Sequence, residues 1–296
     1  MSTLVAVEVR RLLARRLVRV IALLALLGIA VGATIVFLRS EAPSAAQRER
    51  IAGQRQQSIE SCIEDLSPEI GEERARVECE QATVAADRSF DVLELREVAA
   101  GGSGLLVMFG WIVGASAIGA EWQAGTMTTL LTWESRRVRL LLAKVLACAG
   151  VVFAGAILLQ LVLGGALLPS ALWRGSTRGV DANWLREVAG IVVRAGVIAS
   201  IAAVLGFSLA SVARHTAAGL GIAFALSAVI EPLLGAWRPN WQRWFLTQNM
   251  SLFVTGQDPG FPPVDRGLWR PGLVLAVYGL LALCAAALVF RRRDVT

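Results

Sequence analysis

Six hydrophobic runs, each close to the length of a bilayer crossing, limit what this 296-residue chain can fold into. They occupy residues 20–38, 101–120, 145–168, 188–213, 216–236 and 272–290. Hydrophobic residues make up 55% of the chain and the mean hydropathy is +0.60, which excludes a single water-soluble core. The sequence therefore predicts an all-α polytopic membrane protein with six transmembrane helices.

The distribution of basic residues favours one orientation of these helices. Six crossings place both termini on the same side of the membrane. Near the span ends, 13 Lys and Arg lie on the side of the termini, against roughly 8 on the opposite side, and basic loops are retained in the cytoplasm. We therefore expect cytoplasmic N and C termini, with a six-residue cytoplasmic tail at 291–296. Residues 39–100 are expected to be extracytoplasmic.

Residues 1–19 have the pattern of a cytoplasmic amphipathic helix that lies along the membrane surface. At helical spacing, one arc is apolar and the opposite arc is charged. The apolar arc contains Val5, Val9, Leu12, Leu13 and Leu17, and the charged arc contains Glu8, Arg11, Arg15 and Arg19. The alternative is a positively charged flank that only orients the first span.

Residues 39–100 differ in character from the rest of the chain and predict an extracytoplasmic helical domain. The segment carries 8 Arg against 14 Asp and Glu, and Ser67-Pro68-Glu69 has the form of a helix start. Cys62 and Cys79 both lie within it. In an oxidising compartment these two residues are expected to form a disulfide; the alternative is two free thiols.

The last two spans are joined by residues 237–271, which predict an outer interfacial or re-entrant segment. Trp237, Trp241 and Trp244 recur there at helical spacing, either as a wall of an exit path or as an aromatic anchor at the headgroups. Glu231 is the only acidic residue in a predicted span. It either contacts a substrate or a gate, or marks a break of the helix at Pro232.

The supply of reactive residues excludes several classes of enzyme. The single histidine, His215, cannot make a two-histidine metalloprotease site, and no metal-binding pattern is present. A nucleotide-binding P-loop needs a lysine after its glycine run, but the only lysine, Lys144, follows Leu142-Ala143. We expect no catalytic residues in this chain, and any ATP hydrolysis must belong to a separate protein.

The connection at residues 121–144 carries the most specific motif. Its members are Glu121, Gly125-Thr126, Leu130-Leu131, Arg136-Arg137 and Lys144. This spacing resembles the cytoplasmic signature of type-2 ATP-binding-cassette exporter permeases, and the order of spans around it is similar to theirs. The resemblance implies a prokaryotic permease in the plasma membrane of a bacterium. It also implies outward transport of an amphipathic drug, a peptide antibiotic or a lipid-like substrate.

The same resemblance implies the partners. Two permease chains, identical or homologous, would face each other above two ATPase subunits that bind ATP and Mg²⁺. The distribution of charge separately favours a membrane topology over nucleic-acid binding, so no nucleic acid is expected as a partner. Small residues that allow close helix contact within or between chains are Gly28, Gly32, Gly110 and Gly114.

Residues 121–144 are expected to act as a coupling hairpin. Charged members would pair with the ATPase, and apolar members would fill a groove on it. The charged set is Glu121, Arg136, Arg137 and Arg139, and the apolar set is Leu130, Leu131 and Trp133. The alternative function is a membrane sensor or scaffold that binds a ligand or partner through residues 39–100.

Overall fold

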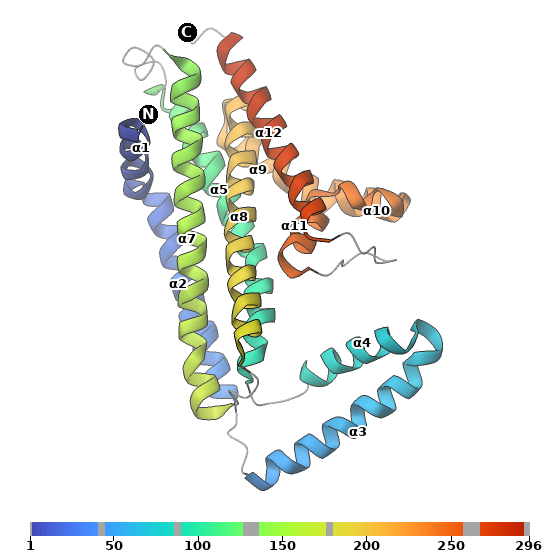
Figure 1. The fold of residues 1–296 in the computed structure, drawn as a ribbon. Coiled ribbons are helices and arrows are strands. Elements are labelled where there is room, and N and C mark those ends of the chain that lie inside the picture. The colour runs from blue at the N-terminus through green and yellow to red at the C-terminus, as the bar shows by residue number, and fades with distance from the viewer. Residues whose placement is uncertain are drawn as a thin grey trace. The chain divides into compact units, whose positions relative to one another are not determined.

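The computed structural model describes residues 2–40, 45–85, 90–126, 136–175, 180–256 and 267–292. Within these ranges the chain is helical and has no β-strand. Six helical segments are long and apolar enough to cross a membrane: α2 (Arg16–Arg39), α5 with the turn before it (Val92–Gln123), α7 (Arg137–Arg174), α8 (Ala182–Ala213), the segment from α9 to α10 (Thr216–Trp237) and α12 (Trp269–Arg292). The predicted all-α class with six spans is confirmed (Figure 1).

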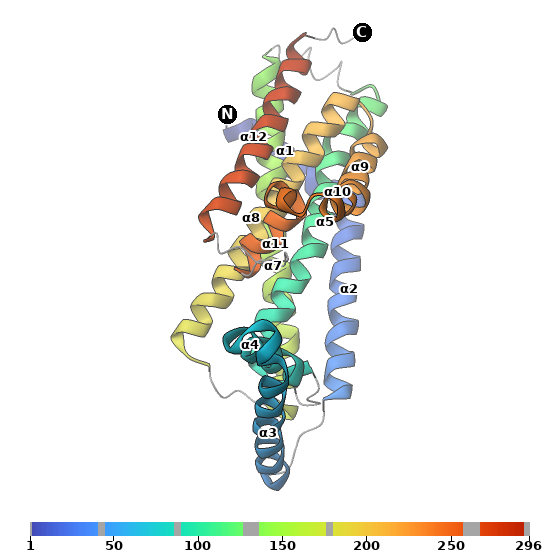
Figure 2. The same cartoon turned by 90° about the vertical axis from the view of Figure 1, so that its right-hand side faces the viewer.

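The chain divides into two compact units. The first comprises residues 1–27, 96–162 and 185–296, and the second comprises residues 28–95 and 163–184. In the first unit α5, α7 and α8 run roughly along a common axis, as Figures 1 and 2 both show. Buried residues of α5, α7, α8 and α12 form one of its apolar cores, in which Phe207 and Ile118 are fully enclosed.

Helices α5 and α8 approach each other closely because α5 presents glycines at the contact. A Cβ on Gly114 would lie 2.0 Å from the carbonyl oxygen of Ala203, and a Cβ on Gly110 would lie 2.3 Å from that of Ala199. Both distances are shorter than any side chain tolerates, so these two glycines serve contacts within one chain. A Cβ on Gly28 or on Gly32 would meet nothing within 4 Å.

The second unit contains a helical hairpin closed by a disulfide. α3 (Ala45–Ile70) and α4 (Glu72–Ala85) are joined at Gly71, and Cys62 is bonded to Cys79 with their Cα atoms 5.8 Å apart. The predicted disulfide is confirmed. The predicted helix start at Ser67-Pro68-Glu69 is wrong, because α3 continues through Pro68. The break falls at Gly71, whose φ of +85° suits glycine and whose N–H donates to the carbonyl of Ser67.

The fifth span changes its helical geometry part-way along. α9 (Thr216–Phe224) passes into a π-helical segment, η2 (Ala225–Ile230), and then into α10 (Glu231–Trp237). The backbone N–H of Glu231 donates to Leu226, five residues earlier. The chain thus stays helical through Pro232, and the expected break there is replaced by a widened turn that precedes the proline.

Two short helices follow this span. η3 (Pro239–Trp244) is a 3-10 helix, and α11 (Leu246–Thr255) is an α-helix of 10 residues. The hydroxyl of Tyr278 on α12 donates to the carbonyl of Trp244 at 2.8 Å, which fixes the end of η3 against the last span. Figures 1 and 2 place α10 and α11 at about the level of the middle of α5 along its axis.

Candidate functional site

A buried ion network lies where α5 ends and α7 begins. The ammonium of Lys144 on α7 is 2.9 Å from Glu8 Oε2 and 2.9 Å from Glu121 Oε2, and it donates to Glu121 Oε1 at 3.1 Å. Lys144 is 3% exposed, Glu8 6% and Glu121 9%. One cation thus joins a carboxylate of α1 (Ser2–Ala14) to a carboxylate at the end of α5.

Arg15 completes the network from the junction of α1 and α2. Its guanidinium donates to Glu121 Oε1 at 2.8 Å and to the backbone carbonyls of Ser116 and Ala117 at 2.7 and 3.0 Å. Arg15 itself is not helical, so the amphipathic helix predicted through Arg19 is interrupted at this residue. Its long side chain reaches α5 from that break.

The network lies beside an apolar core, which raises the cost of disturbing it. Leu12, Ile118 and Leu141, from α1, α5 and α7, are buried in the same cluster. In such surroundings a pair of charges contributes little net stability, but removing one partner leaves a charge without compensation, at about 3–5 kcal/mol. The network therefore specifies the mutual position of three helices more than it adds to stability.

The N-terminal segment packs against the chain through both of its predicted arcs. Glu8, on the charged arc, is buried, and Val5, Val9 and Leu12 of the apolar arc belong to or pack against the core. Leu13 and Leu17, also of the apolar arc, are exposed. The predicted position of this segment along the membrane surface stays a prediction. Two features of the sequence are consistent with an ion pair between Glu8 and Lys144: Glu8 is the only acid in the basic residues 1–19, and Lys144 is the only lysine. Neither feature identifies the partner of the other residue.

The Gly-Thr step of the motif ends α5. Gly125 has a φ of +66° and its N–H donates to Trp122, while the hydroxyl of Thr126 donates to the carbonyl of Glu121 at 3.3 Å. A glycine in the left-handed region is the usual helix terminator. The structure thus gives Gly125 and Thr126 a defined local role at the root of the hairpin. Leu130, Leu131 and Trp133 lie outside the described residues.

The basic members of the motif begin α7. Arg136 precedes the helix, and Arg137 and Arg139 lie in its first turn. Together with Val138 and Arg291 of α12 they line a hollow of about 500 Å³. Glu121 is not among its lining residues, so the structure divides the predicted coupling set into a buried acid and a separate basic surface. The predicted contact of this set with an ATPase stays a prediction.

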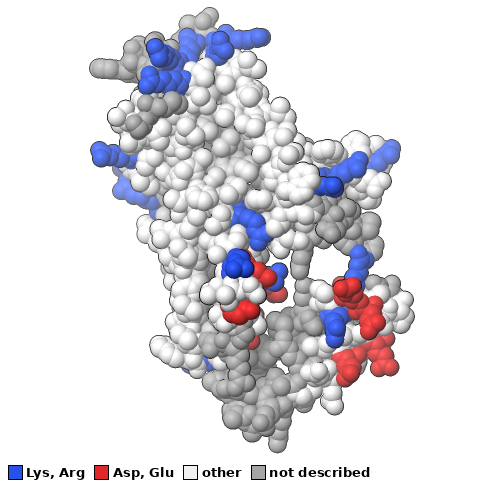
Figure 3. Space-filling view, in the orientation of Figure 1, with Lys and Arg blue, Asp and Glu red and all other residues white. Residues whose placement is uncertain are grey.

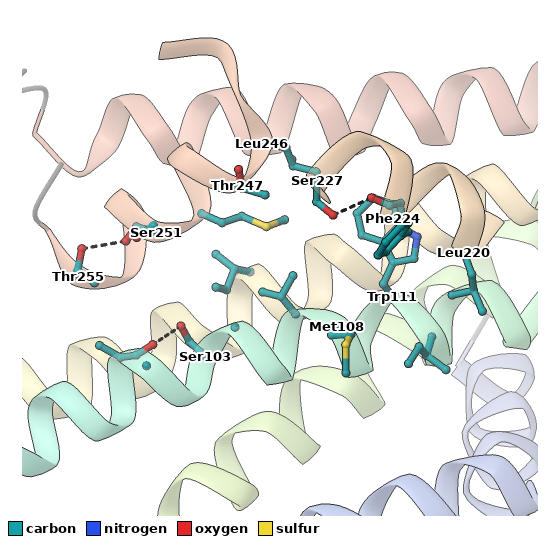
Figure 4. Close-up of a pocket in the computed structure, with 18 residues that line it drawn as sticks. Ser103, Met108, Trp111, Leu220, Phe224, Ser227, Leu246, Thr247, Ser251 and Thr255 are labelled. Carbon is teal, nitrogen blue, oxygen red and sulfur yellow. Dashed lines mark hydrogen bonds between the residues drawn. The ribbon is translucent and has the colours of Figure 1, made fainter. Parts of the chain in front are cut away.

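A larger cavity, of about 610 Å³, lies between α5, α8, the fifth span and α11 (Figure 4). Its walls are mostly apolar, with Met108 and Trp111 from α5, Phe224 from α9 and Met250 from α11. The hydroxyls of Ser103 and Ser227 donate to carbonyls of their own helices, at Ala100 and Ala223. Their oxygens add weakly polar points to an otherwise apolar lining that includes no charged residue.

Glu231 holds one wall of this cavity in place. Its carboxylate accepts from the N–H of Leu246 at 2.6 Å, from the N–H of Thr247 at 3.1 Å and from the hydroxyl of Thr247. An acid at the first turn of a helix satisfies its unpaired N–H groups and complements its dipole. Glu231 therefore positions α11, which carries Met250 and Ser251 of the cavity lining.

The three tryptophans of the predicted outer segment do not line the cavity. Trp237, Trp241 and Trp244 are each at least half exposed. Arg238 lies 5.1 Å from the ring centre of Trp237, and Arg243 lies 5.8 Å from that of Trp244. Exposed indoles beside arginines suit an anchor at the headgroup level. The predicted substrate or gating role of these residues stays a prediction.

Comparison with known families matches residues 3–261 to the family described as ABC-2 family transporter protein. The chain belongs to this family. A comparison with curated proteins finds no match. The resemblance predicted from residues 121–144 is thereby confirmed for the class of permease. The chain is a multi-pass membrane component of an ABC transporter, and its family implies partnering with an ATPase subunit.

Within the ABC-2 permease, the ion network and the hairpin occupy the same end of the first unit. Arg214, in the turn between α8 and α9, lies 4.6 Å from the ring centre of Trp122, and Trp122 meets Phe290 of α12 edge-on at 6.0 Å. The end of α5 is thus bound to α1, α7, α12 and the turn after α8. A displacement of the hairpin root would have to move several spans.

We predict that Lys144→Met destabilises the permease by about 3–5 kcal/mol, because Glu8 and Glu121 would lose the buried cation that they share and keep only the more exposed Arg11 and Arg15. Denaturant unfolding in detergent micelles measures the change. The matched control is Arg11→Gln, which removes an exposed charge 3.3 Å from Glu8 and is expected to cost about 1 kcal/mol or less.

Adding Glu121→Gln to Lys144→Met removes one of the two stranded carboxylates. The double variant should therefore lose less stability than the sum of the single variants. Additive losses would contradict the assignment of a coupled buried network.

Proposed function

We propose that this chain is the transmembrane subunit of an ATP-driven exporter, and that the buried network around Lys144 transmits the movement of the ATPase to the spans. The observation that carries the proposal is the network's place at the root of the hairpin, in a chain of the ABC-2 family. ATP and Mg²⁺ are bound by the ATPase. Two permease chains, identical or homologous, stand above two ATPase subunits, in the plasma membrane of a bacterium.

The orientation proposed for the permease places both termini and the hairpin root in the cytoplasm. The excess of basic residues at those span ends supports it. The disulfide between Cys62 and Cys79 supports it independently, because disulfides persist outside the reducing cytoplasm.

Coupling in this proposal works through the position of Glu121. Its carboxylate is held inside the chain by Lys144 and Arg15, so the ATPase presses on the hairpin and not on this side chain. Separating any of the three helices would expose an uncompensated charge to an apolar core. α1, α5 and α7 are therefore displaced together when the ATPase closes.

The substrate proposed for the exporter is an amphipathic molecule of about drug size, bound in the 610 Å³ cavity. Ligand pockets of this kind are commonly about 300–1,000 Å³, mostly apolar and fitted with a few polar groups. The hydroxyl hydrogens of Ser103 and Ser227 are already donated, so the lining offers acceptors to a substrate that brings its own donors. An amphipathic drug or a lipid-like molecule meets these conditions, and a peptide antibiotic needs the space of a second chain.

The experiment that tests the function uses Glu121→Gln in the complex purified gently from its native membrane. The ATPase should co-purify with both wild type and variant, because the hairpin surface is unchanged. The ratio of transport to ATP hydrolysis should fall by roughly tenfold or more, since a neutral residue no longer holds Lys144 and Arg15 together.

Arg11→Gln is the control for the loss of a nearby charge and should leave the ratio unchanged. An unaltered ratio in Glu121→Gln would remove the network from coupling. Isolation of the wild-type chain without any nucleotide-binding protein would refute the exporter and favour a membrane sensor or scaffold.

The orientation predicts which cysteines react from outside intact cells. After reduction, Cys62 and Cys79 should be labelled by a membrane-impermeant maleimide. In a variant that lacks the native cysteines, Gln123→Cys, at the exposed end of α5, should be labelled only after lysis. The reverse pattern would invert the topology.

The cavity predicts the effect of filling it. Gly104 lines the cavity and a Cβ on it would meet nothing within 4 Å, so Gly104→Leu adds a side chain inside the cavity without a clash. ATP-driven uptake of rhodamine 6G and of an NBD-labelled phospholipid into inverted vesicles should fall by about tenfold, while basal ATP hydrolysis persists.

Gly155→Leu is the matched control for this substitution. A Cβ on Gly155 would also meet nothing within 4 Å, but this residue lies on α7 and does not line the cavity. Equal transport by the two leucine variants would exclude the cavity from the pathway.

A further inference from the structure

A buried carboxylate lies behind the wall that α11 contributes to the cavity of about 610 Å³. Leu246 and Thr247 line that cavity on the side opposite Ser103 and Met108 (Figure 4). The carboxylate of Glu231 accepts from the N–H groups of Leu246 and Thr247 and from the hydroxyl of Thr247. Thr247 also lines a second hollow, of about 300 Å³, to which Glu231 itself contributes. A single residue therefore separates the acid from the cavity.

The hydrogen bonds that hold Glu231 come from neutral groups. Both of its carboxylate oxygens accept, which is the pattern of an ionised acid. The residue is only 6% exposed, and within the described residues no lysine or arginine forms an ion pair with it. The positive end of α11 offsets about half of a unit charge. A net negative charge thus remains behind the cavity wall.

The basic residues that follow Glu231 in the chain lie at the surface. Arg238 and Arg243 are exposed, and their guanidinium groups lie over the rings of Trp237 and Trp244. Figure 3 shows basic side chains that project from the surface in the region of α10. Solvent screens exposed charges, whereas a buried charge is screened much less. The field inside the cavity is therefore set by the carboxylate more than by these arginines.

The start of α12 lies beside the other end of α11. A Cβ on Gly272 would lie 2.9 Å from the ring of Phe253, and Arg270 lies 5.4 Å from the ring centre of Trp269. Ten residues of α-helix extend about 15 Å, so the length of α11 separates this end from the hydrogen bonds of Glu231. Arg270 is thus not placed to neutralise the acid.

The rest of the lining also favours a positive charge. Trp111 and Phe224 contribute aromatic rings, whose faces attract cations. The ring of Trp111 is held in place, because its Nε1–H donates to the carbonyl of Gly219 at 3.3 Å. The hydroxyl oxygens of Ser103 and Ser227 can accept from the N–H of a protonated amine. None of the described lining residues is basic.

We propose that the cavity selects organic cations, which are amphipathic molecules with one positive charge on an amine or an aromatic system. The carboxylate of Glu231 favours them through the wall, without touching them. The inference rests on the exporter proposal for the role of the cavity as the substrate site. It narrows the proposed substrate from a drug-sized amphipathic molecule to a cationic one.

Tetraphenylphosphonium and tetraphenylborate are the probes that test this selectivity, because they have nearly the same size and shape and opposite charge. Equilibrium dialysis measures the binding of each to the purified full-length chain in detergent, with the uptake by protein-free micelles subtracted. Glu231→Gln should lower the ratio of the cation's affinity to the anion's by about tenfold. The neutral side chain removes an attraction for one ion and a repulsion of the other.

Glu187→Gln is the matched control for net charge. It neutralises an acid that pairs with Arg96 and does not line the cavity, so it should change the ratio by less than about twofold. Thr247→Val is the control for a loosened α11, because it removes one hydrogen bond to Glu231 and keeps the charge. Its two affinities should change together and leave the ratio within about twofold of wild type.

Gly104→Leu shows where the probes bind. The added side chain fills part of the cavity, so this variant should bind both ions more weakly than wild type, irrespective of their charge.

Three results would overturn the inference. An equal ratio in wild type and Glu231→Gln would show that the carboxylate does not act on the cavity. Equal falls of the ratio in the Glu187 and Glu231 variants would reduce the effect to net charge. Undiminished binding of the cation by Gly104→Leu would place it outside the cavity. The measurements use neither ATP nor the ATPase, so a chain that binds cations selectively but does not transport would refute the exporter and not the selectivity.

Discussion

The ammonium of Lys144, held between the carboxylates of Glu8 and Glu121, sets the arrangement of the first unit. Each of these charges comes from a different helix, and each would be strongly disfavoured in its apolar surroundings without the others. Arg15 adds a fourth connection, through two backbone carbonyls of α5. The root of the hairpin therefore has one well-defined geometry, which hydrophobic packing alone does not select among helices rich in alanine and leucine.

The sequence predicted the spans well because their signal is local. A run of about 20 apolar residues is sufficient to identify a crossing, whatever it packs against. The disulfide was predictable for a similar reason, since two cysteines in a segment of distinct composition had few alternative roles. The helix start at Ser67-Pro68-Glu69 failed because a proline at the first helical position and a proline in the last turn of a longer helix look alike locally. The positive φ of Gly71 marks the actual break between the two helices.

The ion network was not predictable, because it depends on tertiary register. Glu8 and Lys144 are 136 residues apart in the chain, and no periodicity relates them. The amphipathic pattern of α1 grouped Glu8 with Arg11 on a charged arc and did not indicate that Glu8 is buried. A buried carboxylate breaks the rule that charged residues mark the exposed face, and such breaks concentrate where a structure requires specificity. The assignment of Glu231 was open for the same reason, since its partners lie on α11.

The two sites of the permease differ in how firmly their walls are held. The hairpin root is tied by buried charges, whereas the cavity is bounded on one side by a π-helical segment and on another by the short helix α11. A π-helical turn inside an α-helix is rare and is frequent at functional sites. α11 is attached at its start chiefly through Glu231. In the proposed cycle the ATPase acts on the hairpin root, which the buried charges hold rigid. α5 transmits the displacement to the cavity, because this helix extends from Glu121 past Trp111 to Ser103. A change at the root would then alter the cavity most where its walls are least constrained, at the fifth span and α11.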